Sequence, residues 1–197
     1  MKRKKKFFNR LSIVCGAIAF CLSFISCMRE MSESSMDPIV DYNGSFEEIK
    51  ESLPINWLVY TSKTAGAGDF SITADTSTYA DGNQSLKFLV NNCSPLGGWR
   101  SPGIAQEIPV TAGDTYHLSF FLKNEGTAFS VKISSVTAFE GVEGPSFQSS
   151  ESINEWKKYE YVYQIPANMK RLRFEVNVLS EGVFWIDKVE IEKQINS

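Results

Sequence analysis

The chain has 197 residues, with 20 Lys and Arg, 23 Asp and Glu, and a single His. Six of the basic residues and none of the acidic ones precede Cys27, so residues 27–197 carry a net charge of −9. An acidic surface of this kind argues against nucleic acid or another anionic polymer as the main partner. The length suits one domain of ordinary size once the N-terminal segment is set aside.

The N-terminus is typical of a targeting signal. Basic residues crowd the first ten positions, and residues 11–26 form an apolar run that ends in small side chains. This run is shorter than the roughly 20 residues needed to cross a bilayer. We therefore interpret residues 1–26 as a signal peptide that is removed. Residues 24–27 (Phe-Ile-Ser-Cys) resemble a bacterial lipoprotein cleavage box, which implies that Cys27 becomes the lipidated first residue of the mature protein.

The cysteines agree with this interpretation. Cys15 and Cys21 leave with the signal peptide, and a lipid on Cys27 would leave Cys93 without a partner for an internal disulfide. A disulfide between Cys27 and Cys93 is the alternative, although Cys27 lies in a tail with little to fix its geometry. Residues 27–38 are polar and lack periodicity, so they are expected to form a flexible tether.

Residues 39–197 are interpreted as one domain built of strands. Residues 47–53 are expected to make one helical turn at most, and residues 145–150 a loop or an edge strand. Around ten short strands separated by turn signals indicate an all-β sandwich. The expected strands are residues 57–60, 70–73, 85–90, 104–110, 116–123, 129–133, 156–165, 171–178 and 182–191.

The last strand carries an unusual acid. Alternation places Asp187 on the same face as Trp185 and Val189, a face that is otherwise apolar and expected to be buried. A carboxylate there is costly unless it is paired. We therefore expect the first and last strands to lie together, with a hard cation held between Glu47 and Asp187.

Seven short segments with recognisable residue patterns follow one another along the chain: residues 43–47, 81–87, 105–110, 112–116, 119–123, 156–159 and 185–189. This series resembles the carbohydrate-binding modules of families four, nine and twenty-two, over residues 40–193. The resemblance implies a galactose-binding-like jelly roll, which is an all-β jelly-roll β-sandwich. That fold hosts many functions, so the ligand follows less directly than the fold does.

The resemblance also implies a structural calcium ion, Ca2+, that joins the first and last strands. It assigns carboxylate ligands to Glu47 and Asp187 and backbone carbonyl ligands to Gly44 and Gln84, with a further side chain from Asp81. Calcium prefers six to eight oxygen ligands of this kind. The alternative is that Asp187 accepts backbone amide hydrogen bonds and Glu47 is solvated.

In these modules one concave sheet presents its outward side chains to a groove. Here the outward sets are expected on the strands 116–123 and 171–178, with Ser130, Lys132 and Ser134 on the same face. The resemblance assigns an aromatic platform and polar sugar contacts among the candidate ligand-binding residues His117, Phe121, Arg173, Glu175 and Asn177. As alternatives, a loop covers Phe121, His117 is a plain surface residue, and Arg173 and Glu175 pair with neighbours in the sheet.

Two loops could form a second site at the rim of the sandwich. Trp99, in the glycine-rich loop 93–101, either stacks on a terminal sugar or plugs one open end of the sandwich. In the loop 139–147, an exposed apolar patch around Phe139, Val142 and Phe147 would instead favour a protein partner.

No carboxylate pair, Ser-His-Asp spacing or phosphate loop marks a catalytic site, so the protein is expected not to be an enzyme. The expected function is binding of a polysaccharide or oligosaccharide by a lipoprotein. Cys27 would anchor it to the bacterial outer membrane, facing the periplasm or the cell surface, near envelope enzymes or transporters. The alternative is a protein-interaction or adhesion module of the cell envelope with the same fold.

Overall fold

The computed structural model describes residues 42–65, 68–136 and 142–194. The expected signal peptide, Cys27 and the tether lie outside these ranges and stay predictions. Across the three described ranges, no helix is both long enough and apolar enough to cross a membrane.

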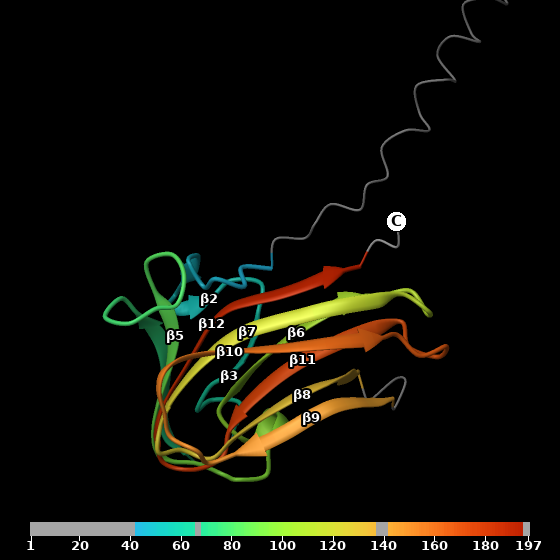
Figure 1. Ribbon diagram of the computed structural model, residues 1–197. Helices are drawn as coiled ribbons and strands as arrows, with labels where there is room; N and C mark the ends of the chain where they lie inside the picture. Colours follow the sequence, from blue (N-terminus) through green and yellow to red (C-terminus); the bar gives the residue numbers. More distant parts are fainter. Residues whose placement is uncertain (1–41, 66–67, 137–141, 195–197) are drawn as a thin grey trace, which may run out of the picture. The chain divides into compact units, whose positions relative to one another are not determined.

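Twelve strands and one short 3-10 helix make up the described part of the chain (Figure 1). The strands are β1 (Ile49–Lys50), β2 (Leu53–Pro54), β3 (Leu58–Tyr60), β4 (Asp69–Asp75), β5 (Ser85–Asn92), β6 (Gly103–Pro109), β7 (Thr115–Glu125), β8 (Phe129–Ser135), β9 (Glu143–Ser149), β10 (Ile153–Gln164), β11 (Arg171–Val178) and β12 (Gly182–Lys193), and the helix is η1 (Gly98–Arg100).

Two five-stranded antiparallel sheets pack on each other, in the orders β10-β7-β12-β5-β4 and β3-β6-β11-β8-β9. The core between them is apolar and rich in phenylalanine, with Phe88, Phe120, Phe129, Phe174 and Phe184 fully buried. The all-β sandwich prediction is therefore confirmed. β9 is an edge strand as expected, whereas the hairpin β1–β2 replaces the single helical turn that the sequence suggested.

The residues Trp185, Asp187 and Val189 of β12 are buried as predicted, but they do not all lie on one side of the sheet. Phe184 and Ile186 belong to the core cluster, whereas Trp185 and Asp187 lie on the opposite face. A β-bulge between Asp187 and Glu190, where Lys188 has a φ of 47°, then turns Val189 toward the core. An inserted residue shifts a strand's alternation by one, which simple period-two counting cannot detect.

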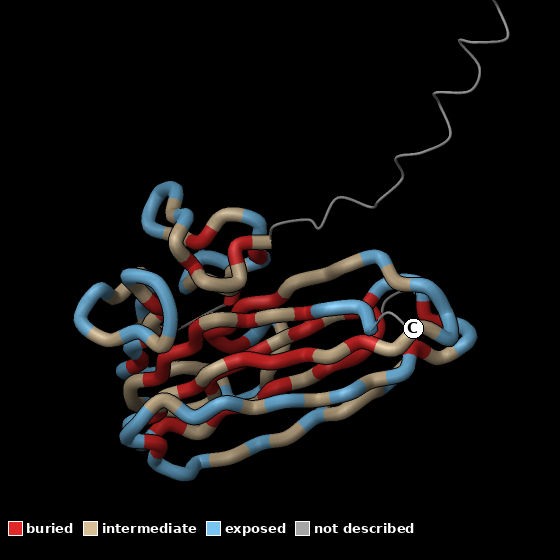
Figure 2. Tube along the Cα trace, turned by 45° about the horizontal axis from the view of Figure 1, so that its top comes forward, coloured by how far each residue is buried: buried red, intermediate tan, exposed pale blue. Residues whose placement is uncertain are grey.

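Trp185 and Asp187 are buried, at 5% and 0% exposure, although they face away from the core. Residues 75–84 form a roof over this outer face, from which the N–H groups of Ala80 and Asp81 donate to Asp187 Oδ2. The indole of Trp185 donates to Asp75 Oδ2 (2.9 Å), and the ammonium groups of Lys87 and Lys123 lie over its ring. Figure 2 shows buried positions through the central strands, and exposed ones at the turns and along the outermost strands. One sheet of the sandwich thus carries a second small packed layer on its outside.

Candidate functional site

The outer face of the other sheet, β3-β6-β11-β8-β9, is polar. Residues 172, 174 and 176 of β11 are fully buried, so the residues between them point outward. The strand register places Glu107 and Ser134 beside Arg173, Ala105 and Lys132 beside Glu175, and Gly103 and Ser130 beside Asn177. The prediction that β8 and β11 share a polar face is confirmed.

This face holds a groove of about 360 Å³. Its floor comes from β8, β9 and β11, and the loop before β6 forms one wall. The volume falls within the range of small-molecule binding sites. Besides the outward residues of β11, the lining includes Leu96, Gly98, Ser130, Lys132, Ser146 and Gln148.

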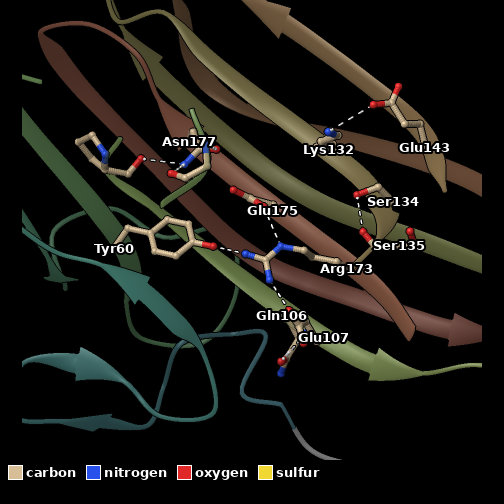
Figure 3. Close-up of polar contacts among 12 residues, drawn as sticks. Tyr60, Gln106, Glu107, Lys132, Ser134, Ser135, Glu143, Arg173, Glu175 and Asn177 are labelled. Carbon is tan, nitrogen blue, oxygen red and sulfur yellow. Dashed lines mark hydrogen bonds and ion pairs between the residues drawn. The ribbon is translucent and has the colours of Figure 1, made fainter. Parts of the chain in front are cut away.

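Arg173 is the centre of an ionic cluster at the groove (Figure 3). Its Nε donates to Glu175 Oε2 (2.7 Å), one terminal nitrogen donates to Glu107 Oε1, and the other donates to the hydroxyl of Tyr60. Burial, with the nearby Glu175 carboxylate, raises the pKa of Tyr60 to about 12. A guanidinium has five N–H donors, so Arg173 retains donors for a ligand. The alternative of pairing across the sheet is confirmed for Arg173, which binds Glu107 on β6, whereas Glu175 pairs with Arg173 within β11.

Glu175 uses only one of its oxygens. Its Oε1 is buried and accepts no hydrogen bond from the described residues. Unsatisfied buried acceptors are uncommon in native proteins and recur at functional sites. Glu175 Oε1, near Gly98 in the wall of the groove, can therefore accept a hydrogen bond from a ligand.

Asn177 lines the groove, but its side-chain amide is already engaged. Its Oδ1 accepts from the N–H of Gly98 (2.8 Å), and its Nδ2 donates to the carbonyl oxygens of Gly98 (3.0 Å) and Pro102 (3.5 Å). The residue is 4% exposed. The structure thus gives Asn177 a loop contact where the resemblance implied a sugar contact.

Trp99 is exposed on η1, in the loop that forms one wall of the groove. Its side chain is 65% exposed, and that of Leu96 in the same loop is 63% exposed. The alternative that Trp99 plugs an open end of the sandwich is therefore wrong. Trp99 and Leu96 therefore offer exposed apolar surface in this loop.

His117 and Phe121 lie on β7, in the opposite sheet, so the prediction that they share a face with Arg173 is wrong. His117 lies 3.5 Å from Glu160 across the β7–β10 pair. Phe121 is half-buried in register with Asp187 and Lys158. Sequence alternation gives the face of a strand but not the sheet to which the strand belongs.

The expected apolar patch on the loop 139–147 is only partly described. Phe139 lies outside the described residues. The half-buried ring of Phe147 contacts Phe129 and Tyr159, at centroid separations of 5.9 and 5.3 Å. Phe147 thus packs against the core rather than standing free as a docking surface.

The four predicted calcium ligands converge on one region, as expected for the two ends of the domain. Val189 N–H donates to the Gly44 carbonyl (2.9 Å). Asp187 Oδ2 accepts from Ala80 and Asp81 N–H (2.7 and 2.9 Å), and Glu47 Oε1 accepts from Gln84 N–H (3.2 Å).

These N–H donors already bind the oxygens that the prediction offers to the metal. In the described part of the chain, no group of three or more His, Cys, Asp or Glu side chains is placed to hold a metal ion. The alternative of backbone amide bonds to Asp187 is confirmed, and calcium binding stays a prediction.

Residues 40–182 match the carbohydrate binding domain family. The protein belongs to this family. Comparison with curated proteins gave no match.

Solved structures of carbohydrate-binding modules share the fold of this carbohydrate-binding domain. One, described under "CBM4 structure and function", has a TM-score of 0.52 at 19% identity. The match covers 77% of this chain and 98% of the chain in that structure. The module TmCBM61, in complex with β-1,4-galactotriose, has a TM-score of 0.53 at 20% identity, with 77% and 96% covered. The C-terminal family 22 module of Clostridium thermocellum Xyn10B has a TM-score of 0.52 at 19% identity, with 78% and 96% covered.

Several residues of the groove in this carbohydrate-binding domain were missed from the sequence. Tyr60, Glu107, Ser146 and Gln148 come from three further strands. Each had a readable alternation, but nothing in a strand's own sequence states which strands lie beside it. The pairing of β11 with β6 and of β8 with β9 would have brought Glu107, Ser146 and Gln148 to this sheet face, and the pairing of β3 with β6 would have added Tyr60.

Proposed function

We propose that the groove over β8, β9 and β11 binds a glycan chain. The observation that carries this proposal is a polar groove on an open sheet face with an exposed indole in the loop that forms its wall. Sugars offer apolar C–H faces to an aromatic ring and paired hydroxyls to planar polar groups. Trp99 supplies the first kind of surface, while Ser130, Gln148 and the free donors of Arg173 supply the second.

Binding leaves the glycan intact. A glycosidase places its substrate between two carboxylates that act as acid and as base or nucleophile. In this groove the guanidinium of Arg173 binds both Glu107 and Glu175, so it occupies the space between them. This arrangement favours holding a sugar over cleaving one.

The protein acts at the bacterial outer membrane, where a lipid on Cys27 anchors it facing the periplasm or the cell surface. Support comes from the sequence: a basic start, an apolar run and a cysteine box. The polar residues 27–38 give the domain reach from the membrane. In this position it captures glycan for neighbouring envelope enzymes or transporters.

A structural calcium ion is also proposed between the segment 43–47 and β12. Hard oxygens from Gly44, Glu47 and Asp187 lie close to the same loop, which is the type of ligand that calcium takes. EDTA is expected to lower the melting temperature by several degrees, and added calcium to restore it. An unchanged melting temperature would show that the N–H contacts to Asp187 and Glu47 hold this region without a metal.

The binding proposal is tested with the purified protein on a glycan array and in affinity gels that contain xylan or galactan. We expect binding to at least one glycan, and Trp99→Ala to weaken it about tenfold, since one lost stacking surface corresponds to about 1.4 kcal/mol. Val162→Ala is the matched control, because Val162 is 63% exposed on β10 of the other sheet. Absence of binding to every glycan would overturn the proposal.

A further inference from the structure

The loop 93–102 is held to the sheet by one side-chain amide. Asn177 accepts a hydrogen bond from the N–H of Gly98 and donates one to the carbonyl oxygen of the same residue. A single amide thereby satisfies both backbone groups of Gly98, as a neighbouring strand would do. Asn and Gln are the side chains that carry an acceptor oxygen and a donor nitrogen side by side on one planar group.

A buried serine ties the other half of the loop. Ser101 is fully buried, and its hydroxyl accepts from the N–H of Gly97 (2.8 Å) and donates to the carbonyl oxygen of Ser94. The carbonyl oxygen of Pro102 in turn accepts from the N–H of Val178 (2.9 Å), at the end of β11. Contacts therefore hold the loop at both ends and in its middle.

Glycines make this arrangement possible. Gly97 and Gly98 have φ values of 70° and 58°, which side chains strongly disfavour. A Cβ on Gly103 would lie 2.3 Å from Asn177 Nδ2, so the missing side chain leaves space for the amide. The glycines thus permit this loop conformation, and the hydrogen bonds of Asn177 and Ser101 select it.

The loop presents Leu96 and Trp99, the two most exposed apolar side chains that it contains. Ordering backbone costs free energy, and a loop ordered before binding spares the ligand that cost. We propose that Asn177 is a positioning residue, which fixes the loop so that Trp99 faces the ligand in a preset orientation. This inference rests on the proposed glycan binding, and it replaces the direct sugar contact that the sequence suggested for Asn177.

Two readouts test the proposal. The first needs no ligand: hydrogen exchange of the Gly97 and Gly98 amides in the wild type and in Asn177→Ala. The second measures the affinity for xylohexaose and β-1,4-galactotriose in the wild type, Asn177→Ala, Trp99→Ala and the double variant. Ser101→Ala is a second route to the same loosening, should Asn177→Ala fail to fold.

The chain offers matched controls for both variants. Asn124 is a buried asparagine whose amide bonds to Thr127 and Glu151, neither of which lines the groove. Ser85 is a buried serine whose hydroxyl donates to Thr78 in the roof of the opposite sheet. Asn124→Ala and Ser85→Ala therefore remove the same chemistry without touching the loop.

We expect exchange at Gly97 and Gly98 to rise at least about tenfold in Asn177→Ala or Ser101→Ala, and to stay unchanged in the controls. Affinity should fall about tenfold in Asn177→Ala. In the Trp99→Ala background, Asn177→Ala should have no further effect, because it acts through that side chain.

Unchanged exchange, or effects of Asn177→Ala and Trp99→Ala on affinity that simply add, would overturn the positioning role. If the wild type binds neither oligosaccharide, that result counts against the proposed function. Exchange then decides by itself whether Asn177 holds the loop.

Discussion

Each of the two sheets has a tryptophan on or beside its outer face, and these two side chains differ in exposure. Trp185 on β12 is 5% exposed, because residues 75–84 cover it and Asp75 accepts from its indole. Trp99, beside the other sheet, is 65% exposed. A tryptophan covered by its own chain is part of the fold, whereas one left bare on a constrained loop is available to a ligand.

The carboxylates make the same comparison. Asp187 is fully buried beneath the roof, and N–H groups of Ala80, Asp81 and Lys188 satisfy its two oxygens. Glu175, on the open sheet, has one oxygen that accepts nothing from the described residues. Within the described residues, the chain thus satisfies both oxygens of Asp187 and only one of Glu175.

The largest expected difference is between the effects of replacing Trp185 and Trp99 on the free energy of unfolding. Trp185→Ala should lower the free energy of unfolding by about 3–4 kcal/mol, because it empties a packed layer. Trp99→Ala should change it by less than about 0.5 kcal/mol. Urea denaturation of both variants measures the contrast, and equal losses would mean that Trp99 is packed in solution.

Asp187→Ala should cost about 3 kcal/mol, because it leaves three buried or half-buried N–H groups without an acceptor. Asp81→Ala is the control, since the Asp81–Lys188 ion pair is exposed and such pairs contribute about 0–1 kcal/mol. Denaturant midpoints with unchanged slopes report the two losses. A small loss in Asp187→Ala would show that water replaces the carboxylate under the roof.

The sequence predicted the sandwich because alternation and turn residues are local signals. β7 and β11 show clear alternation, and their extent matches the expected strands closely. The change of side after Asp187 in β12 was missed, because a bulge there breaks the alternation without any marked residue type. A left-handed Lys188 is not a signal that composition provides.

The candidate site was predicted only in part. Arg173 and Glu175 line the groove, and Trp99 is exposed in the loop that forms its wall, since one strand's alternation and one glycine-rich loop were enough to find them. Phe121 and His117 do not line the groove, because sheet membership depends on long-range pairing. The engagement of Asn177 with Gly98, 79 positions away in the chain, could be read only from coordinates.

The ionic cluster at the groove allows a sharper comparison within one strand. Arg173→Met should cost about 2 kcal/mol, because Glu107 and Glu175, whose side chains are 15% and 12% exposed, lose their shared partner. Arg171→Met removes a half-exposed partner of Glu107 and should cost less than about 1 kcal/mol. Urea denaturation measures both, and equal costs would mean that solvent screens the cluster throughout.

The pH dependence of stability separates the roofed carboxylate from exposed ones. Burial raises the pKa of Asp187 from 3.8 to about 6, against the lowering effect of the hydrogen bonds from the amides of Asp81, Ala80 and Lys188. Because the folded pKa is above the unfolded one, the stabilisation from the protonated carboxyl is fully present below about pH 3.8. It is lost as the pH rises through about 6.

Asp187→Asn removes this titration and provides the reference curve. From about pH 4 to about pH 7, the wild type should lose about 1–2 kcal/mol of unfolding free energy relative to Asp187→Asn, since one unit of pKa corresponds to about 1.4 kcal/mol and relaxation of the roof reduces the full effect. The wild type should show no such loss relative to Asp81→Asn, which changes an exposed carboxylate in the same loop and keeps Asp187. Parallel curves for the wild type and Asp187→Asn would mean that the amide contacts keep Asp187 ionised under the roof, and the comparison with Glu175 would then rest on hydrogen bonding alone.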